Sequence, residues 1–378
     1  MFNRINHNQD NKLWQSYVDG DIDEFRNLIE SGENVNCLVG QERHYFSGCS
    51  LISAVIENYL DVEAEKNKQF FDILISNNVH LGTIGRGKSL ITSAMSFGDN
   101  SIYFTEELLK INKTTSFGTE RTSEKISSKD FPPIFLAVAS GSIEQMDLLF
   151  KYNVDLKELG MHNETILNFI LDHKPELALK LFPIFIKNGA DPEQKGSNHE
   201  TCLYKICYHN NALELFNIIY TSKTNMNSLN VSKQTPIMAA FTYKNTNLAK
   251  LYIDKGSDVN MQDVYGKTAS MYAVIKIEDN YEMFDNMSSF GVNFEIKDNY
   301  GDNLFHYMGV SFLKIQKSKD KKHFMRFLLE HKKLLEEKNS RGHTPLSYIK
   351  ERSEVDYNIL SNAIKNDKKS INSDCHDK

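Results

Sequence analysis

The sequence has 378 residues, of which 40% are hydrophobic and 11% aromatic, and its formal net charge is −6. This much apolar material excludes disorder over most of the chain, because it is enough to build a packed core. The negative net charge provides no global basic field, so a partner recognised through its phosphates, such as duplex DNA or RNA, is not favoured.

Short helices with capping residues are predicted at a regular spacing along the chain. The first pair is expected to have an inner helix near 14–18 and an outer helix with its exit turn over 21–36. Each later unit is anchored by the residue expected to cap its inner helix. In chain order these residues are Ser50, Ser89, Pro132, Thr165, Thr201, Thr235, Thr268, Asn303 and Thr344. Five of the eight gaps between them are 33 to 36 residues long, and the longer gaps predict inserted loops that leave the stack intact.

The apolar pattern within a unit predicts two packed helices. After a break at Ser140 and Gly141, apolar residues recur at three- and four-residue spacing, as in Ile143, Met146 and Leu149. Alanines in the inner helices permit close packing, and larger residues of the outer helices cover them.

Three stretches depart from this regularity. A charged insertion lies near 62–68, a polar insertion over 112–129 is expected to form a mobile loop, and the lysine-rich Lys314–Lys322 lengthens the ninth unit. Residues 366–378 have no apolar periodicity and are expected to form a disordered tail.

One stretch carries a specific family resemblance. Thr235–Ala240, with the sequence Thr-Pro-Ile-Met-Ala-Ala, is followed by Asp254–Asn260, with the sequence Asp-Lys-Gly-Ser-Asp-Val-Asn, and the next copy starts at Thr268. This resembles the ankyrin repeat, whose pattern is Thr-Pro-Leu-His-x-Ala-Ala, a second helix and Gly-Ala-Asp-Val-Asn. The resemblance implies an all-α fold, an ankyrin-repeat solenoid of stacked helix-turn-helix units with short projecting hairpin loops.

The resemblance extends from residue 11 to about 365 and implies a single ankyrin-repeat domain over 1–365. Ten units are expected to start near residues 11, 47, 86, 129, 162, 198, 232, 265, 300 and 341. The sixth unit has His199 where glycine is usual and Cys202 where proline is usual, and the ninth lacks both Thr and Pro. These departures affect local geometry rather than the fold.

Residues Gly82–Ser89 match the phosphate-binding pattern G-x-x-x-x-G-K-[ST]. In a nucleotide-binding enzyme, Lys88 would reach the terminal phosphates and Ser89 would coordinate magnesium. That loop requires a buried β-strand before it, whereas residues 70–77 align with the outer helix of a unit. The helical interpretation is therefore favoured, and a nucleotide-binding enzyme that uses the Gly82–Ser89 loop is the alternative.

His199, Cys202, Cys207 and His209 have the residue types of a zinc site, but their spacing matches no common ligand set. In the repeat register Cys207 takes a small buried position that a free thiol fills well. The resemblance gives His306 a structural role, since it stands at the histidine of the Thr-Pro-Leu-His pattern. The sequence therefore predicts no metal, no cofactor and no catalytic residue.

The position after that histidine faces the concave groove in ankyrin stacks, and its occupants become large toward the C-terminus. Tyrosine and arginine favour protein interfaces, because they bring a large contact area at a small cost in rotamer entropy. Together with residues at the hairpin tips they form the predicted partner-binding set. This set is Phe169, Tyr265, Tyr272, Tyr300, Tyr307, Arg341, His343 and Tyr348. The alternative is that the tyrosines pack against one another and only stiffen the stack.

The resemblance implies a non-enzymatic scaffold that binds a partner protein on its concave face. Degenerate repeats and abundant Asn, Lys and Ile suggest a bacterial or viral protein that acts on a host protein. A second alternative to this function is a nucleic-acid-associated or anti-defence scaffold, in which Lys314–Lys322 contacts phosphates.

Five cysteines, an odd number spread over a long chain, indicate reduced thiols in a cytosolic compartment. The N-terminus has no apolar signal segment, and no apolar run approaches the length of a membrane span. The expected location is the cytoplasm, or a host cell reached without a Sec-type signal peptide.

Overall fold

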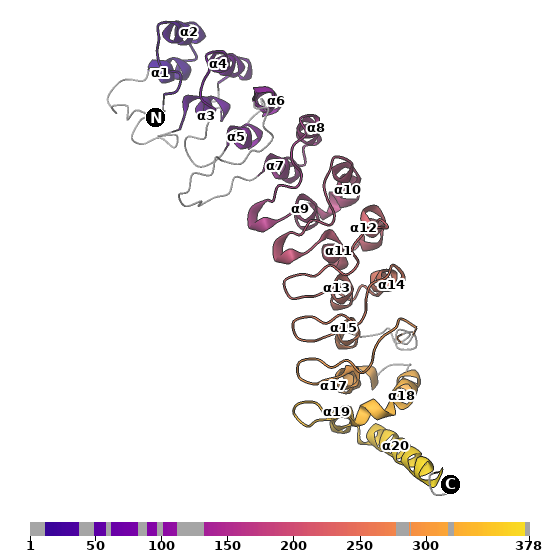
Figure 1. The fold of residues 1–378 in the computed structure, drawn as a ribbon. Helices are drawn as coiled ribbons and strands as arrows, with labels where there is room; N and C mark the ends of the chain where they lie inside the picture. Colours follow the sequence, from indigo (N-terminus) through magenta and orange to yellow (C-terminus); the bar gives the residue numbers. More distant parts are fainter. Residues whose placement is uncertain are drawn as a thin grey trace. The chain divides into compact units, whose positions relative to one another are not determined.

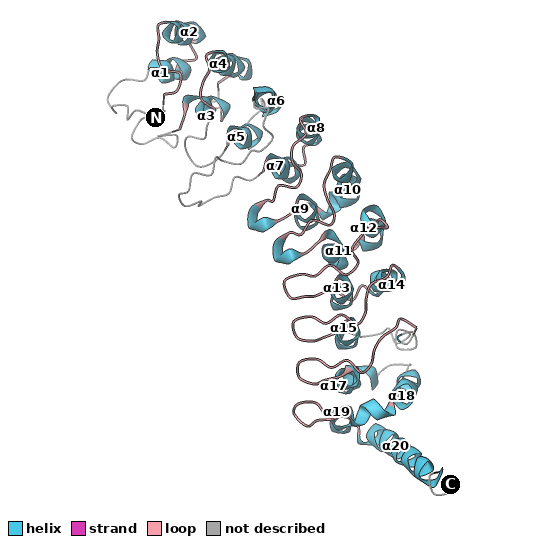
Figure 2. Ribbon diagram, viewed as in Figure 1, coloured by secondary structure: helices cyan, strands magenta, loops and turns pink. Residues whose placement is uncertain are grey.

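A computed structural model describes residues 12–37, 49–57, 62–81, 89–96, 101–111, 132–276, 287, 289–316 and 321–374. Within these ranges the chain forms helices joined by turns and contains no β-strand (Figure 2), which confirms the predicted all-α class. The chain divides into two compact units, Met1–Asp191 and Pro192–Lys378. That residues 1–365 form one continuous domain stays a prediction.

The first unit consists of helix pairs in two layers (Figure 1). Its α-helices are α1 (Lys12–Val18), α2 (Ile22–Glu30), α3 (Leu51–Ile56), α4 (Ala64–Ser76), α5 (Leu90–Ser96), α6 (Ser101–Ile111), α7 (Pro133–Ser140), α8 (Ile143–Lys151), α9 (Ile166–His173) and α10 (Ala178–Lys187). Two short 3-10 helices, η1 (Met161–Asn163) and η2 (Pro175–Leu177), flank α9. The odd-numbered helices α3, α5, α7 and α9 contact one another in sequence, and each pairs with the even-numbered helix that follows it. The odd-numbered helices are therefore the inner layer.

The second unit repeats this arrangement (Figure 1). Its helices are η3 (Ser197–His199), α11 (Cys202–Lys205), η4 (Ile206–Tyr208), α12 (Ala212–Ile219), α13 (Pro236–Thr242), α14 (Thr246–Asp254), α15 (Ala269–Lys276), α17 (Leu304–Gln316), α18 (Lys321–Glu330), η5 (Lys332–Glu336), α19 (Pro345–Arg352) and α20 (Glu354–Asp374). The inner helices α11, α13, α15, α17 and α19 contact one another in that order. In the outer layer α12 contacts α14, and α18 contacts α20.

The predicted capping residues stand directly before the inner helices. Ser50, Thr165 and Thr344 are N-caps whose hydroxyls accept the N–H three residues later, at 3.2 to 3.3 Å. Pro132, Thr201 and Thr235 hold the same place but make no side-chain hydrogen bond to the helix N-terminus. The register derived from the repeat pattern is therefore confirmed at these helices.

The C-terminal helix α20 differs from the sequence-based expectation. It continues to Asp374, although residues 366–378 were expected to be a disordered tail. The segment Glu354–Asp374 contains neither glycine nor proline, so nothing in it stops a helix once Leu360 and Ile364 are buried.

The inserted stretches have different outcomes. Residues 64–68 of the charged insertion form the start of α4 rather than a loop. The polar insertion 112–129 lies outside the described residues, as do the side chains of Lys314–Lys322.

Candidate functional site

Tight hairpins project between the helix pairs and share one backbone geometry. In the described residues, the N–H of the first hairpin residue donates to the carbonyl of the fifth, at 2.8 to 3.1 Å, in six places. The first residues of these hairpins are Gly160, Gly196, Asn230, Asp263, Asp298 and Asn339. The fourth residue has a positive φ in all six, and it is Asn163, His199, Lys233, Gly266, Gly301 or Gly342. His199 thus occupies a position that favours glycine, as the repeat register predicts.

The first residue also ties the hairpin together through its side chain. Asp263 Oδ1 accepts the N–H of Tyr265 at 2.8 Å and that of Lys267 at 2.9 Å. The same two bonds recur, at 2.8 to 3.0 Å, in the hairpins that begin at Asn230, Asp298 and Asn339. Asp and Asn suit this position, because a short side-chain oxygen reaches the backbone two residues ahead.

Backbone hydrogen bonds join successive hairpins of the second unit. The N–H of the second hairpin residue donates to the carbonyl of the third residue of the preceding hairpin, at 2.8 to 3.0 Å. The four donors are Val231, Val264, Asn299 and Ser340. Hairpins 196–200 to 339–343 therefore form one hydrogen-bonded row, which we call the hairpin ladder. It holds the side chains of neighbouring tips in fixed relative positions.

Two of the predicted tyrosines support this ladder from behind. The hydroxyl of Tyr272 donates to Asp263 Oδ2 at 2.6 Å, and that of Tyr307 donates to Asp298 Oδ2 at 2.5 Å. Burial, and then the hydrogen bond to the carboxylate, raises the pKa of Tyr272 to about 12 and that of Tyr307 still further. Both phenols remain neutral donors at physiological pH, so each hairpin aspartate has a partner for both oxygens.

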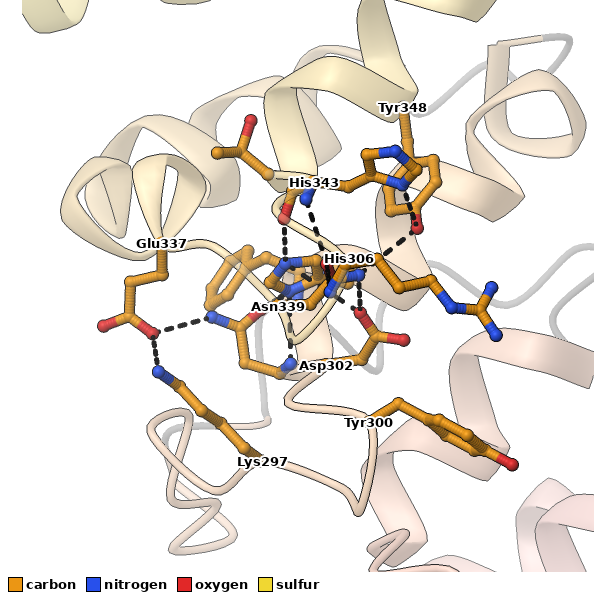
Figure 3. A network of polar contacts seen from close by, with 12 residues as sticks. Lys297, Tyr300, Asp302, His306, Glu337, Asn339, His343 and Tyr348 are labelled. Atoms are coloured by element: carbon orange, nitrogen blue, oxygen red, sulfur yellow. Dashed lines mark hydrogen bonds and ion pairs between the residues drawn. The ribbon is translucent and has the colours of Figure 1, made fainter.

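A polar network joins the last two hairpins (Figure 3). The buried imidazole of His306 lies with Nε2 3.2 Å from the carbonyl oxygen of His343, and its Nδ1 lies 3.1 Å from the N–H of Asn303. Because a carbonyl oxygen only accepts, Nε2–H donates from α17 to the last hairpin, and Nδ1 also lies 2.7 Å from Asn303 Oδ1. Asn339 Nδ2 adds a second link, at 2.7 Å to Asp302 Oδ1.

Tyr348 closes the same network at its edge. Its hydroxyl lies 3.3 Å from His343 Nδ1 and 3.4 Å from Asn339 Nδ2 (Figure 3). On the opposite side, Lys297 Nζ pairs with Glu337 Oε2 at 2.9 Å. Tyr348 is thus held by polar contacts, as Tyr272 and Tyr307 are.

The tips themselves present aromatic rings and cations. Tyr265 is 54% exposed and Tyr300 is 51% exposed, and Tyr300 points away from the polar network in Figure 3. Lys267 Nζ lies 6.0 Å from the ring centroid of Tyr265 and 5.5 Å from that of Tyr307. The guanidinium of Arg341 lies 5.8 Å from the Tyr300 ring. Cations at these distances are attracted to the face of the ring.

Comparison with known proteins identifies the repeat. A family model for three copies of the ankyrin repeat matches residues 203–298, which include α13 to α15 and the hairpins that begin at Asn230 and Asp263. The chain is an ankyrin-repeat protein. It is distantly related to a poxvirus protein, the putative ankyrin repeat protein FPV230 of fowlpox virus (strain NVSL). The two are 27% identical over 146 residues, which cover 34% of this chain and 78% of the relative.

The ankyrin-repeat protein is also similar to a solved structure, the ankyrin repeat domain of Bcl-3, a member of the IkappaB protein family. The sequence identity is 19% and the TM-score 0.47, over 61% of this chain and 97% of the other. In the part of the chain that the structure describes, no helix has the length and apolar character needed to cross a membrane.

Seven of the eight predicted site residues lie in the ladder or directly behind it, and Phe169 does not. Phe169 belongs to the first unit and is 6% exposed, with its ring centroid 5.1 Å from that of Phe135 and 4.3 Å from that of His173. Its large ring fills the inner layer between neighbouring helices, so we remove it from the candidate site.

The described residues before the loop do not form the β-strand that the nucleotide-binding alternative requires there. Residues 70–76 belong to α4, so a helix stands where the phosphate-binding loop needs a strand. Ser89 Oγ accepts the N–H of Thr92 at 3.1 Å and thereby caps α5. The remainder of the motif, Gly82–Lys88, lies outside the described residues.

The candidate zinc cysteine is a buried thiol. Cys207 Sγ lies 3.5 Å from the carbonyl oxygen of Leu203 and 3.4 Å from that of Pro236. Burial raises the pKa of Cys207 to about 12, whereas a zinc ligand must lose its proton. Across the described ranges, no three residues among His, Cys, Asp and Glu are grouped so that they would hold a metal ion.

Sequence reasoning missed the aspartates that organise the ladder. Asp263 and Asp298 stand nine residues before Tyr272 and Tyr307, at the same place in consecutive units. That shared Asp-to-Tyr spacing was the available signal. Sequence reasoning also missed the exposed Val231 and Val264, which lie at the second position of their hairpins.

Proposed function

We propose that this ankyrin-repeat protein is a non-enzymatic scaffold that binds a partner protein along the hairpin ladder of its second unit. Tyr265, Tyr300, Arg341 and His343 make the direct contacts. The observation that carries the proposal is that two tyrosines stand more than half exposed on hairpins fixed by backbone hydrogen bonds.

Such a surface suits protein binding for two reasons. A tyrosine has few rotatable bonds, so it covers a large area of partner surface at a small cost in conformational entropy. The ladder adds to this, because tips that are already ordered lose little further freedom when a partner docks. Tyr272, Tyr307 and Tyr348 act from behind by holding the first residue of each hairpin.

We further propose that the partner is a host protein and that this chain is a viral effector acting inside the infected cell. The likeness to a fowlpox virus protein supports the viral form of this proposal over the bacterial one. Ankyrin repeats typically serve as interaction scaffolds, which favours binding over catalysis as the effector's mode of action.

A crosslinking pull-down from host-cell extract tests the proposed face. The Y265A/Y300A double variant is compared with wild type, since these rings are exposed and their loss leaves the ladder bonds in place. V355S/I359S is the matched control, because it removes two exposed apolar side chains from α20. A partner captured by wild type and the control but lost from Y265A/Y300A supports the proposal. A partner retained by Y265A/Y300A moves the interface elsewhere on the molecule.

A further inference from the structure

Two cations of the hairpin ladder have no carboxylate partner among the residues that the structure describes. Lys233, Lys267 and Arg341 lie at the third to fifth positions of their hairpins. Within the described residues, Lys267 and Arg341 lie over tyrosine rings, and no carboxylate oxygen is within ion-pair distance of either. Lys233 and Arg341 are exposed and Lys267 is partly exposed, so the tips offer positive charge to solvent in a chain whose net charge is −6.

The carboxylates of the same hairpins are turned inward. Asp263 and Asp298 are buried, and each accepts two backbone N–H groups and one tyrosine hydroxyl. Asp302, which is partly buried, accepts the side-chain amide of Asn339. The first hairpin of the unit has Glu200 at its fifth position and no cation, so the cationic stretch begins at Lys233.

The outward-facing groups are consequently hydrogen-bond donors. Lys267 offers an ammonium, Arg341 a planar guanidinium, and Tyr265 and Tyr300 their hydroxyls. Arginine pairs with a carboxylate through two parallel hydrogen bonds, and a tyrosine under the cation leaves those donors free to do so. A surface that offers donors and positive charge is complementary to a partner rich in carboxylates.

We infer, on the basis of the function proposed above, that the partner presents an acidic, extended segment to the ladder. Its carboxylates pair with Lys267 and Arg341, and the chain between them lies across Tyr265 and Tyr300. Each hairpin is two chain passes wide, which is about 10 Å, and an extended peptide advances about 3.3 Å per residue. Lys267 and Arg341 stand on hairpins two places apart, so carboxylates about six residues apart meet both cations, and a segment with an acidic residue at every third position contains that spacing.

Fluorescence anisotropy with short labelled peptides tests the charge requirement on the full chain. One twelve-residue probe carries Glu at every third position among Ser and Gly, and the matched probe carries Gln at the same positions. We expect the Glu probe to bind about tenfold more tightly than the Gln probe, because exposed ion pairs contribute little individually. The preference should shrink as salt rises from 50 to about 200 mM.

Matched variants locate the effect. K267Q/R341Q should abolish the preference for Glu, whereas K255Q/K350Q should preserve it, because Lys255 and Lys350 also lie over tyrosine rings, those of Tyr220 and Tyr357, but not on the ladder. Equal binding of the two probes, or a preference that survives K267Q/R341Q, overturns the inference. Tighter binding of a labelled single-stranded oligothymidylate would overturn it in favour of nucleic acid.

The pull-down separates this inference from the function on which it rests. If Y265A/Y300A loses a host partner that K267Q/R341Q fully retains, the ladder is supported as the binding face and the proposal of an acidic segment is refuted. A partner retained by both variants removes the ladder as the binding face altogether.

Discussion

Thr235 is the N-cap residue of α13, yet its buried hydroxyl has no hydrogen-bond partner among the residues that the structure describes. The repeat pattern has a histidine three residues later, and this chain has Met238 there instead. A buried hydroxyl left unpaired costs about 1–3 kcal/mol, so T235V should raise the free energy of unfolding by about 1 kcal/mol in urea titration. T268V is the control, since Thr268 Oγ1 is 2.9 Å from Ser270 Oγ, and it should lower stability. A similar loss in both variants would contradict the argument.

Tyr307 is both a predicted contact residue and a support for its hairpin. Replacing it with phenylalanine keeps the ring but leaves Asp298 Oδ2 without its donor, so we expect Y307F to lose about 1–2 kcal/mol of stability. Y300F should change stability by less than about 0.5 kcal/mol, because the Tyr300 ring is exposed at the tip. Equal unfolding free energies for Y307F and wild type would show that the hydroxyl bond is not structural.

Two glycines of the ladder form a matched pair at the scale of the hairpin. Gly266 and Gly342 both have positive φ, so alanine is strained at either, by about 1 kcal/mol. A Cβ on Gly266 would lie 2.8 Å from the backbone N of Asn299 in the next hairpin, whereas a Cβ on Gly342 would meet nothing within 4 Å. G266A should therefore lower the urea midpoint clearly more than G342A. The ladder geometry would be refuted by equal midpoints.

The helix pair α17 and α18 with the turn that follows contains two histidines that are shielded from solvent. His306 is buried, and the ring of His331 packs against those of Phe294 and Phe327, with centroids 4.5 and 4.8 Å away. Burial lowers the pKa of both histidines below the ordinary value. At a pH where the unfolded histidines gain protons, the folded state binds fewer protons than the unfolded state. The contribution of the two neutral histidines to the free energy of unfolding is therefore fully present above a pH of about 6.5 and is lost as the pH falls.

We therefore expect the urea midpoint to fall between about pH 7 and pH 5, in the range where the unfolded histidines gain protons. H331L should show a smaller fall than wild type, because one of the two groups is gone. H162Q, which changes an exposed histidine, should fall as wild type does. A pH dependence unchanged in H331L would assign the effect to other groups.

Across the whole molecule, the sequence predicted the features that depend on local chemistry. Capping residues such as Thr165 and Thr344 and the positive φ of His199 follow from the repeat register alone. Features that depend on distant partners were out of reach. Phe169 is buried because Phe135 of the preceding helix pair packs against it.

The second unit should unfold as a row of coupled neighbours, and α13 lies inside that row. Ala240 of α13 is buried, and α13 contacts both α11 and α15. A240D places an unpaired charge in this helix seam, so we expect a loss of about 3–5 kcal/mol in urea unfolding.

The destabilisation caused by A240D should also decrease with distance from α13 along the row of inner helices. Amide hydrogen exchange should rise most in α11, α13 and α15 and less toward α19, because each helix pair is stabilised mainly by its nearest neighbours. N362D adds the same charge at an exposed position of α20 and should leave exchange in α13 unchanged. If A240D instead raised exchange evenly from α11 to α19, the second unit would unfold as one block rather than by nearest-neighbour coupling.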